Sequence, residues 1–151
     1  MVAKFSLQSV LDVRHSRVEG LEIELSQLVQ AENEALERLL VLERAQAELY
    51  ATMRAARQGE VKLNELALTD RELLQLEKRL EQARGNRRRL HEQVDAKRSQ
   101  LVQARQDEEV LETLKGKEIE RQHAEEVQSE NRAVDEIYVA QAFRQRHGEV
   151  P

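Results

Sequence analysis

Two carboxylate–histidine pairs in the sequence have the residue types and the interval of a metal site. Glu120 precedes His123 by three positions, and Asp12 precedes His15 by the same interval. On a helix this spacing places both side chains on one face, the arrangement with which helix bundles hold pairs of metal ions. A di-metal site also needs two further carboxylates that converge in a dry core. Because 35% of the residues are charged, the spacing also arises by chance, and a solvated helix face is the favoured interpretation.

Other catalytic groupings are missing from the sequence. His91 and His147 have no neighbours arranged for catalysis, and the serines are scattered without a Ser–His–Asp grouping. No glycine-rich loop follows a strand pattern, so a phosphate cradle is not expected. The chain has no cysteine, which excludes disulfides and thiolate metal sites. We therefore expect a protein that is not an enzyme and that carries no cofactor.

The composition indicates long helices. The 151 residues include two Phe, two Tyr, no Trp and one Pro, which is the last residue. Leu, Glu, Arg, Gln and Ala dominate, and all are good helix formers. The longest strongly apolar run, Leu39 to Leu42, is too short to span a bilayer. A net charge of −5 gives no field that would gather nucleic acid. We expect a cytoplasmic chain with no direct membrane insertion.

The first arm carries a sustained heptad pattern. Twelve of fifteen positions at alternating intervals of three and four are apolar, and disorder does not account for such a pattern over about seven heptads. Ser6 is a plausible N-cap and Gly59 a plausible stop. The positions, called the seam below, are 7, 11, 14, 18, 21, 25, 28, 32, 35, 39, 42, 46, 49, 53 and 56.

The second arm opens on a capping box. Thr69 and Glu72 have the spacing of a capping box, in which the side chain of each residue accepts a hydrogen bond from the backbone N–H of the other. Eight of the next ten seam positions are apolar. We expect one helix over residues 6–58, a tip loop or short helix over 59–69, a second helix over 70–143 and a tail over 144–151. The second set of seam positions is 73, 76, 80, 83, 87, 90, 94, 97, 101 and 104.

The two arms should fold back antiparallel, because each buries its apolar stripe best against the other. The predicted fold is therefore all-α, a long antiparallel two-helix coiled-coil hairpin with unequal arms, forming a single domain. A turn between Gly59 and Asp70 would place Glu32 opposite Lys97. A charged seam residue facing an opposite charge costs less than one facing Leu, so this register is favoured.

The longer second arm should project past the N-terminus. In this register, residues after about 128 have no partner on the first helix, and the seam is lost between Lys115 and Glu126. Beyond that point a new apolar face, with nothing in the chain to cover it, is formed by Val127, Val134, Ile137 and Tyr138. This face is either a site of homo-oligomer contact or a docking element for another protein.

A basic cluster lies in the middle of the second arm. Arg84 and Arg87 to Arg89 form a possible patch for phosphate or an acidic partner, although an exposed helix face balanced by nearby glutamates is the favoured interpretation. Gly85 and Asn86 weaken the helix there and allow a local bend.

The two ends of the sequence resemble the FliJ family, a small coiled-coil component of the bacterial flagellar type III export apparatus. The opening, FSLQSVLDVR at residues 5–14, is similar to the start of that family. The segment from Asn131 to Glu136 resembles its C-terminal end. Leu76–Lys78 with Glu81–Gln82 resembles the start of its second helix. Chain length, helical layout and the absence of cysteine agree over essentially the whole chain.

The resemblance implies a cytoplasmic protein that works at the cytoplasmic face of the inner membrane. Its expected partners are the flagellar export ATPase ring, the export-gate membrane protein and the export chaperones, and nucleic acid is not among them. The family is also similar in shape to the central stalk of rotary ATPases. On that basis the apolar face of Val127, Val134, Ile137 and Tyr138 would meet the ATPase ring.

The resemblance also implies a contact with the export gate in the loop-side half of the hairpin. The matching positions are Leu42, Ala45, Leu49 and Leu76, although the family can show aromatic residues where this chain has Ala45, Leu49 and Glu72. The seam already uses Leu42, Leu49 and Leu76 for packing. An injectisome stalk protein and a rotary-ATPase stalk subunit are the alternatives, and the latter should carry a sheet domain that this pattern does not predict.

Overall fold

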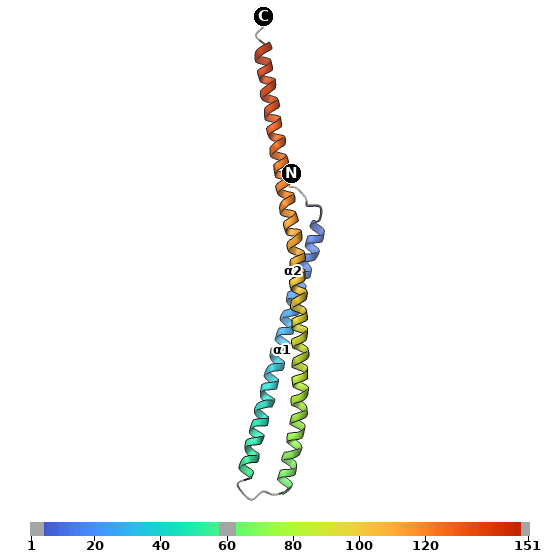
Figure 1. Ribbon diagram of the computed structural model, residues 1–151, viewed down its shortest axis with the longest axis vertical. Coiled ribbons are helices and arrows are strands. Elements are labelled where there is room, and N and C mark those ends of the chain that lie inside the picture. The colour runs from blue at the N-terminus through green and yellow to red at the C-terminus, as the bar shows by residue number, and fades with distance from the viewer. Residues whose placement is uncertain (1–4, 58–62, 149–151) are drawn as a thin grey trace. The chain divides into compact units, whose positions relative to one another are not determined.

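The computed structural model describes residues 5–57 and 63–148, and these residues form two α-helices and no strand. Helix α1 spans Gln8–Ala56 and helix α2 spans Leu63–His147 (Figure 1). Their 49 and 85 residues correspond to about 74 and 128 Å of helix. The two helices pack against each other, so the predicted all-α hairpin with unequal arms is confirmed.

Helix α1 begins two residues later and ends two residues earlier than expected. The backbone N–H of Gln8 donates to the carbonyl oxygen of Phe5, and that of Leu11 donates to Leu7. At the other end Arg57 donates its N–H to Met53. Differences of this size are ordinary at fraying helix ends. The expected stop at Gly59 lies outside the described residues.

Helix α2 begins seven residues earlier than predicted, because the capping box does not cap it. The hydroxyl of Thr69 donates to the carbonyl oxygen of Glu65, one turn back within the helix, at 2.8 Å. The preceding residues are good helix formers, and Leu66 and Leu73 are both half-buried. Residues 63–69 therefore extend α2 and do not form a separate tip element.

Helix α2 also runs past its predicted end. Its last helical residue is His147, and the N–H of Gly148 donates to the carbonyl oxygen of Arg144. Residues 144–147 of the predicted tail are thus helical. The bend that Gly85 and Asn86 allowed does not interrupt the helix, and no described glycine has a positive φ.

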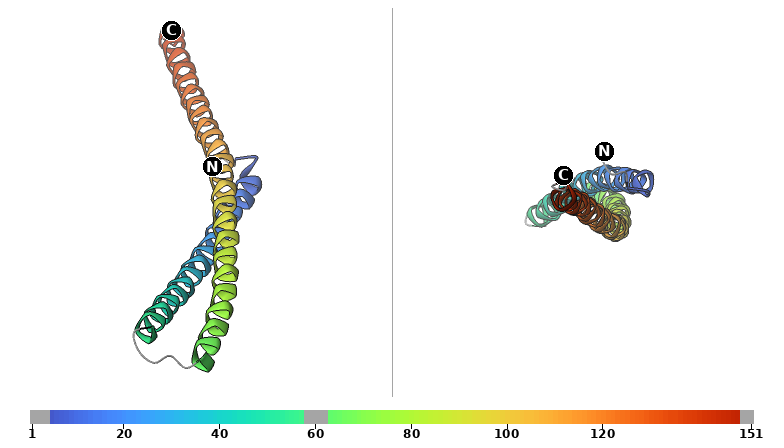
Figure 2. Two further views of the ribbon diagram at one scale, coloured as in Figure 1. Left: turned by 60° about the horizontal axis from the view of Figure 1, so that its bottom comes forward. Right: turned by 90° about the horizontal axis from the view of Figure 1, so that it is seen from above.

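The chain divides into two compact units, and each helix passes from one unit into the other. The hairpin unit comprises Val18–Gln103, and the end unit comprises the residues up to Arg17 together with those from Ala104. Within the hairpin unit the helices run antiparallel, and further views show them side by side (Figure 2).

The core of the hairpin unit lies on the predicted seam. From residue 11 to residue 53, every predicted position of α1 is buried or half-buried. Leu80 is 1% exposed and Val94 is fully buried. Arg87 is an exception, since it is exposed and Asn86 is half-buried in its place. The buried residues of this unit are Val18, Leu21, Ala35, Leu39, Leu80, Val94 and Leu101.

Packing within the hairpin unit weakens toward the loop. No described residue between Leu40 and Arg57, or between Leu63 and Arg79, is fully buried. Figures 1 and 2 show the two helices of this unit parting near the loop. We call these two ranges the loop-end half.

The register differs from the prediction by about one heptad. Lys97 pairs with Glu24 at 2.7 Å and not with Glu32, whose carboxylate lies 2.8 Å from His91 Nδ1. Because α2 begins seven residues early, the turn comes early and the whole of α2 shifts along α1. Such a slip keeps leucines facing leucines, so the heptad pattern does not oppose it.

The seam of the end unit continues further than predicted. Leu11, Ala104 and Leu111 are buried. Beyond them the same spacing continues with the half-buried polar residues Lys115, Glu118 and Gln122. The prediction that the seam is lost at Lys115 is therefore wrong: its apolar residues end there, whereas the packing positions persist.

Polar contacts fix the register of the end unit. A guanidinium N–H of Arg14 donates to the carbonyl oxygen of Asp107 at 2.9 Å, and His15 Nδ1 lies 2.8 Å from a carboxylate oxygen of Glu108. Their residue numbers add up to 121 and 123, as do those of the Lys97–Glu24 and His91–Glu32 pairs of the hairpin unit.

Candidate protein-docking surfaces

The last part of α2 projects without cover from the rest of the end unit. Every described residue from His123 to Gly148 is exposed. We call residues 123–147 the terminal segment. Its exposure was predicted, although it begins about five residues earlier than the predicted register placed it.

The four predicted docking residues all lie on the terminal segment. Val127 is 40% exposed, Val134 62%, Ile137 59% and Tyr138 73%. An exposed apolar residue is unremarkable when it stands alone. Four within twelve positions of one uncovered helix indicate a surface made for contact.

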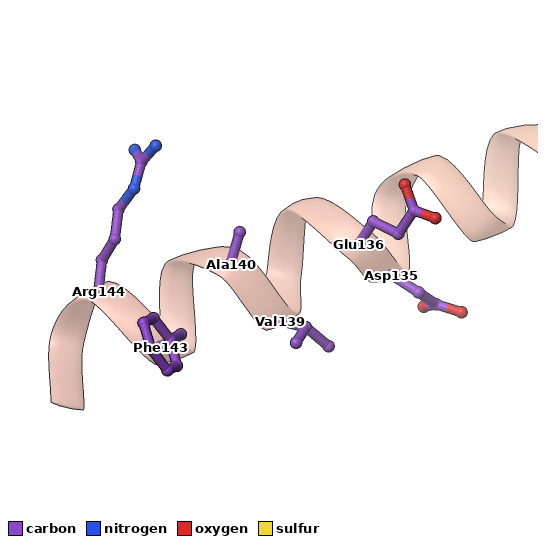
Figure 3. Close-up of a pocket in the computed structure, with 6 residues that line it drawn as sticks. All are labelled: Asp135, Glu136, Val139, Ala140, Phe143 and Arg144. Carbon is purple, nitrogen blue, oxygen red and sulfur yellow. The ribbon is translucent and has the colours of Figure 1, made fainter. Parts of the chain in front are cut away.

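Sequence reasoning missed two further apolar residues of the terminal segment. Val139 is 65% exposed and Phe143 is 60% exposed. They project from the same side of the helix, whereas Ala140 and Arg144 project from another (Figure 3). The ring of Phe143 packs edge-on against that of His147, with centroids 4.2 Å apart. The interval of four residues between Val139 and Phe143 places them on one side of a helix, and it could have identified this pair from the sequence.

These residues place apolar side chains on opposite sides of one helix. Each residue turns the helix by about 100°, so Val134 and Tyr138 share one side, while Val139 and Phe143 lie well round from it. The latter pair line a shallow hollow of about 530 Å³ that also has Asp135, Glu136, Ala140 and Arg144 at its edge. A partner that buries all of these apolar side chains must contact opposite sides of the helix.

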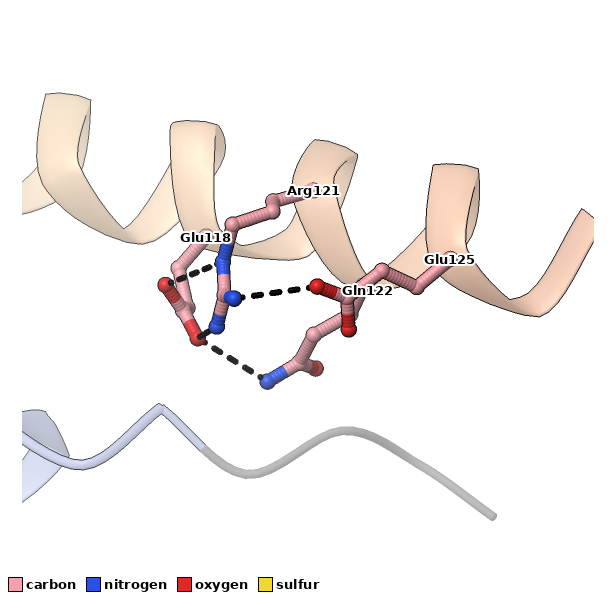
Figure 4. Close-up of polar contacts among 4 residues, drawn as sticks. All are labelled: Glu118, Arg121, Gln122 and Glu125. Carbon is pink, nitrogen blue, oxygen red and sulfur yellow. Dashed lines mark hydrogen bonds and ion pairs between the residues drawn. The ribbon is translucent and has the colours of Figure 1, made fainter. Parts of the chain in front are cut away.

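A charged cluster precedes the terminal segment. The guanidinium of Arg121 donates to both oxygens of Glu118, at 2.6 and 3.3 Å, and to Glu125 at 3.1 Å (Figure 4). These hydrogen bonds lower the pKa of Glu118 and raise that of Arg121. The side-chain amide of Gln122 also donates to Glu118 at 3.2 Å, while its own oxygen is buried without a partner among the described residues.

The structure does not bring the two carboxylate–histidine pairs together. His15 contacts Glu108, and Asp12 accepts a hydrogen bond from Gln8 at 2.9 Å. Within the described ranges no group of three or more His, Asp or Glu residues could hold a metal ion. Glu120 and His123 lie on the exposed surface that leads into the terminal segment.

The predicted gate residues lie in the loop-end half. Leu42, Ala45, Leu49 and Leu76 are all half-buried, and all but Ala45 stand at seam positions. Leu42 also borders a groove of about 310 Å³ formed by both helices, with Ala35, Ala83 and polar side chains. Each of these apolar side chains is therefore partly packed and partly exposed.

Comparison with known proteins gives one match. The model of the family described as flagellar FliJ protein matches residues 3–148, which is nearly the whole chain. The chain belongs to the FliJ family. No curated protein and no solved structure matches it.

Family membership confirms the resemblance drawn from the two ends of the sequence. It makes this FliJ-family chain a component of the flagellar protein export apparatus. Neither helix has a described stretch long and apolar enough to cross a membrane.

Proposed function

We propose that this FliJ-family protein acts by helix docking: its terminal segment enters the ring of the flagellar export ATPase. The observation that carries this proposal is the exposure of apolar side chains on opposite sides of the uncovered helix, from Val134 to Phe143. A flat partner surface would cover one side only. A ring covers all of them, and burying a large apolar side chain contributes about 1.5–3 kcal/mol.

The protein's role in this proposal is mechanical and not catalytic. It couples the ATPase ring to the export gate and to chaperone-bound cargo, at the cytoplasmic face of the inner membrane, without inserting into the bilayer. It needs no cofactor and binds no nucleic acid. The loop-end half, with Leu42, Ala45, Leu49 and Leu76, would meet the export gate, because its half-open seam leaves apolar surface for a partner.

The test of ring docking is a pull-down with the purified hexameric ATPase. A chain truncated before Val127 should lose binding. The full-length variant Ile137→Asp should lose most of it, because a charge would enter an apolar contact. Ile23→Asp is a matched control, since Ile23 is 60% exposed and Ile137 59%, and Ile23 lies in the hairpin unit. Unchanged binding by the truncated chain would contradict the proposal.

Gate contact is tested separately by photo-cross-linking to the cytoplasmic domain of the gate protein. A benzophenone side chain in place of half-buried Leu76 should cross-link, and one in place of Leu74, which is 55% exposed on another side of α2, should not. Equal yields from both positions would contradict a contact centred on the seam. Circular dichroism of both variants checks that the hairpin stays folded.

A further inference from the structure

Three arginines of the hairpin unit gather around one hollow on the surface of α2. Arg84, Arg87 and Arg88, together with His91, line a hollow of about 450 Å³ on α2. All three are exposed, and no described side chain forms an ion pair or hydrogen bond with any of them. We call these three residues the arginine face.

The acidic residues nearby do not neutralise the arginine face. Sequence spacing allowed Glu81 or Glu92 to pair with it, yet neither does so in the structure. Glu32 and Asp95 stand at one edge, where they contact His91 at 2.8 and 3.5 Å. A negatively charged partner would therefore lie over the arginines and away from that edge.

The spacing of the arginine face selects the shape of its partner. Arg84 and Arg88 stand on successive turns of α2, with Arg87 beside them, and side chains on successive turns are about 5–6 Å apart. Glutamates at intervals of four on another helix repeat at the same distance. Arginine binds carboxylates through paired N–H donors, so the two arrays match in charge and geometry.

Other anionic partners fit less well. The hollow has no Phe, Tyr or Trp on which a base could stack. Anionic membranes are usually bound by clusters of about four to eight basic residues. The arginines here, with Arg89 included, only reach the lower limit of that range, and the chain has a net charge of −5. The same net charge would repel an acidic helix from most of the surface and direct it to the arginine face.

We propose that the arginine face docks an acidic helix of a partner protein, at a surface separate from the terminal segment and the loop-end half. The probe is a fluorescent 21-residue alanine-based helical peptide with Glu at every fourth position, measured by anisotropy in low-salt buffer. The double variant Arg84→Gln/Arg88→Gln should weaken its binding by about tenfold or more, in line with the strength of charge-assisted hydrogen bonds.

The control Arg54→Gln/Arg71→Gln removes the same charge from two other exposed arginines of the hairpin unit, and it should change binding less than twofold. A peptide with Gln in place of Glu should not bind. Equal losses in both double variants, or equal binding of the Gln peptide, would overturn the proposal. Binding of phosphatidylglycerol vesicles without binding of the Glu peptide would assign the face to membranes and also overturn it. Circular dichroism checks that both variants fold.

Discussion

The hairpin unit and the terminal segment share helix α2, yet they use apolar residues in opposite ways. In the hairpin unit the apolar side chains form one stripe, and Leu80 and Val94 are buried against α1. In the terminal segment they lie on opposite sides of the helix, and Tyr138 and Val139 remain 73% and 65% exposed. One stripe needs one partner helix. Apolar side chains on opposite sides need a partner that contacts both sides.

On the proposed docking, this difference separates residues that hold the fold from residues that bind a partner. Substitutions at the buried seam positions of the hairpin unit should change stability first and binding only as a consequence. Substitutions in the terminal segment should change binding alone, because no other described part of the chain covers that segment.

The largest expected effect is a loss of stability at Leu80. Leu80→Ala should lower the free energy of unfolding by about 3 kcal/mol, because it removes a side chain that is 1% exposed and leaves a cavity between the helices. Urea unfolding followed by circular dichroism measures this change. Ile137→Ala is the contrast and should leave the unfolding midpoint within error. Equal destabilisation by the two variants would remove the distinction between the regions.

The next largest effect is on binding through Phe143, which lies on the side of the terminal segment that sequence reasoning missed. Phe143→Glu should weaken binding to the export ATPase by about tenfold or more, as Ile137→Glu should, because an enclosing partner contacts both sides. Calorimetry or anisotropy with the purified ring measures both variants. If Phe143→Glu binds like wild type while Ile137→Glu does not, the partner covers a single side and is not a ring around the helix.

Much of the fold was predictable because packing of two helices depends on periodicity. The seam from Leu11 to Met53 was read from 3-4 spacing alone, and each of its positions is buried or half-buried. Register was not predictable in the same way, since a slip of one heptad preserves the spacing. The Thr69–Glu72 box misplaced the turn, because residues 63–69 extend the helix and Thr69 bonds back to Glu65.

The candidate site was predicted in part for a related reason. Val127, Val134, Ile137 and Tyr138 were found by asking which apolar residues the first helix leaves uncovered. Val139 and Phe143 were missed because the search assumed a single apolar face. The arginine face was visible as a charge run, but only the structure shows that neighbouring glutamates leave it unpaired.

A smaller effect tests the corrected register. Lys97 pairs with Glu24 across the helices, and this contact is partly exposed. A double-mutant cycle with Glu24→Gln and Lys97→Gln should give a coupling energy of about 0.5 kcal/mol, typical of such pairs. The cycle with Glu32→Gln and Lys97→Gln should give none within error. Coupling of Lys97 to Glu32 in place of Glu24 would restore the register that the sequence alone suggested.

The smallest effect concerns the charged cluster at the base of the terminal segment. Hydrogen bonding to Arg121 lowers the pKa of Glu118 in the folded chain. The ionised carboxylate therefore stabilises the helix above the ordinary glutamate pKa of about 4.3, and this stabilisation is lost as pH falls through the lowered pKa. An NMR titration should show the pKa of Glu118 lowered from its ordinary value. In Arg121→Gln its pKa should return toward that value.

If the pKa of Glu118 is not lowered in the wild-type chain, the cluster does not persist in solution. The base of the terminal segment would then be held by packing against the first helix alone, and the cluster would add nothing to the contrast between the two regions.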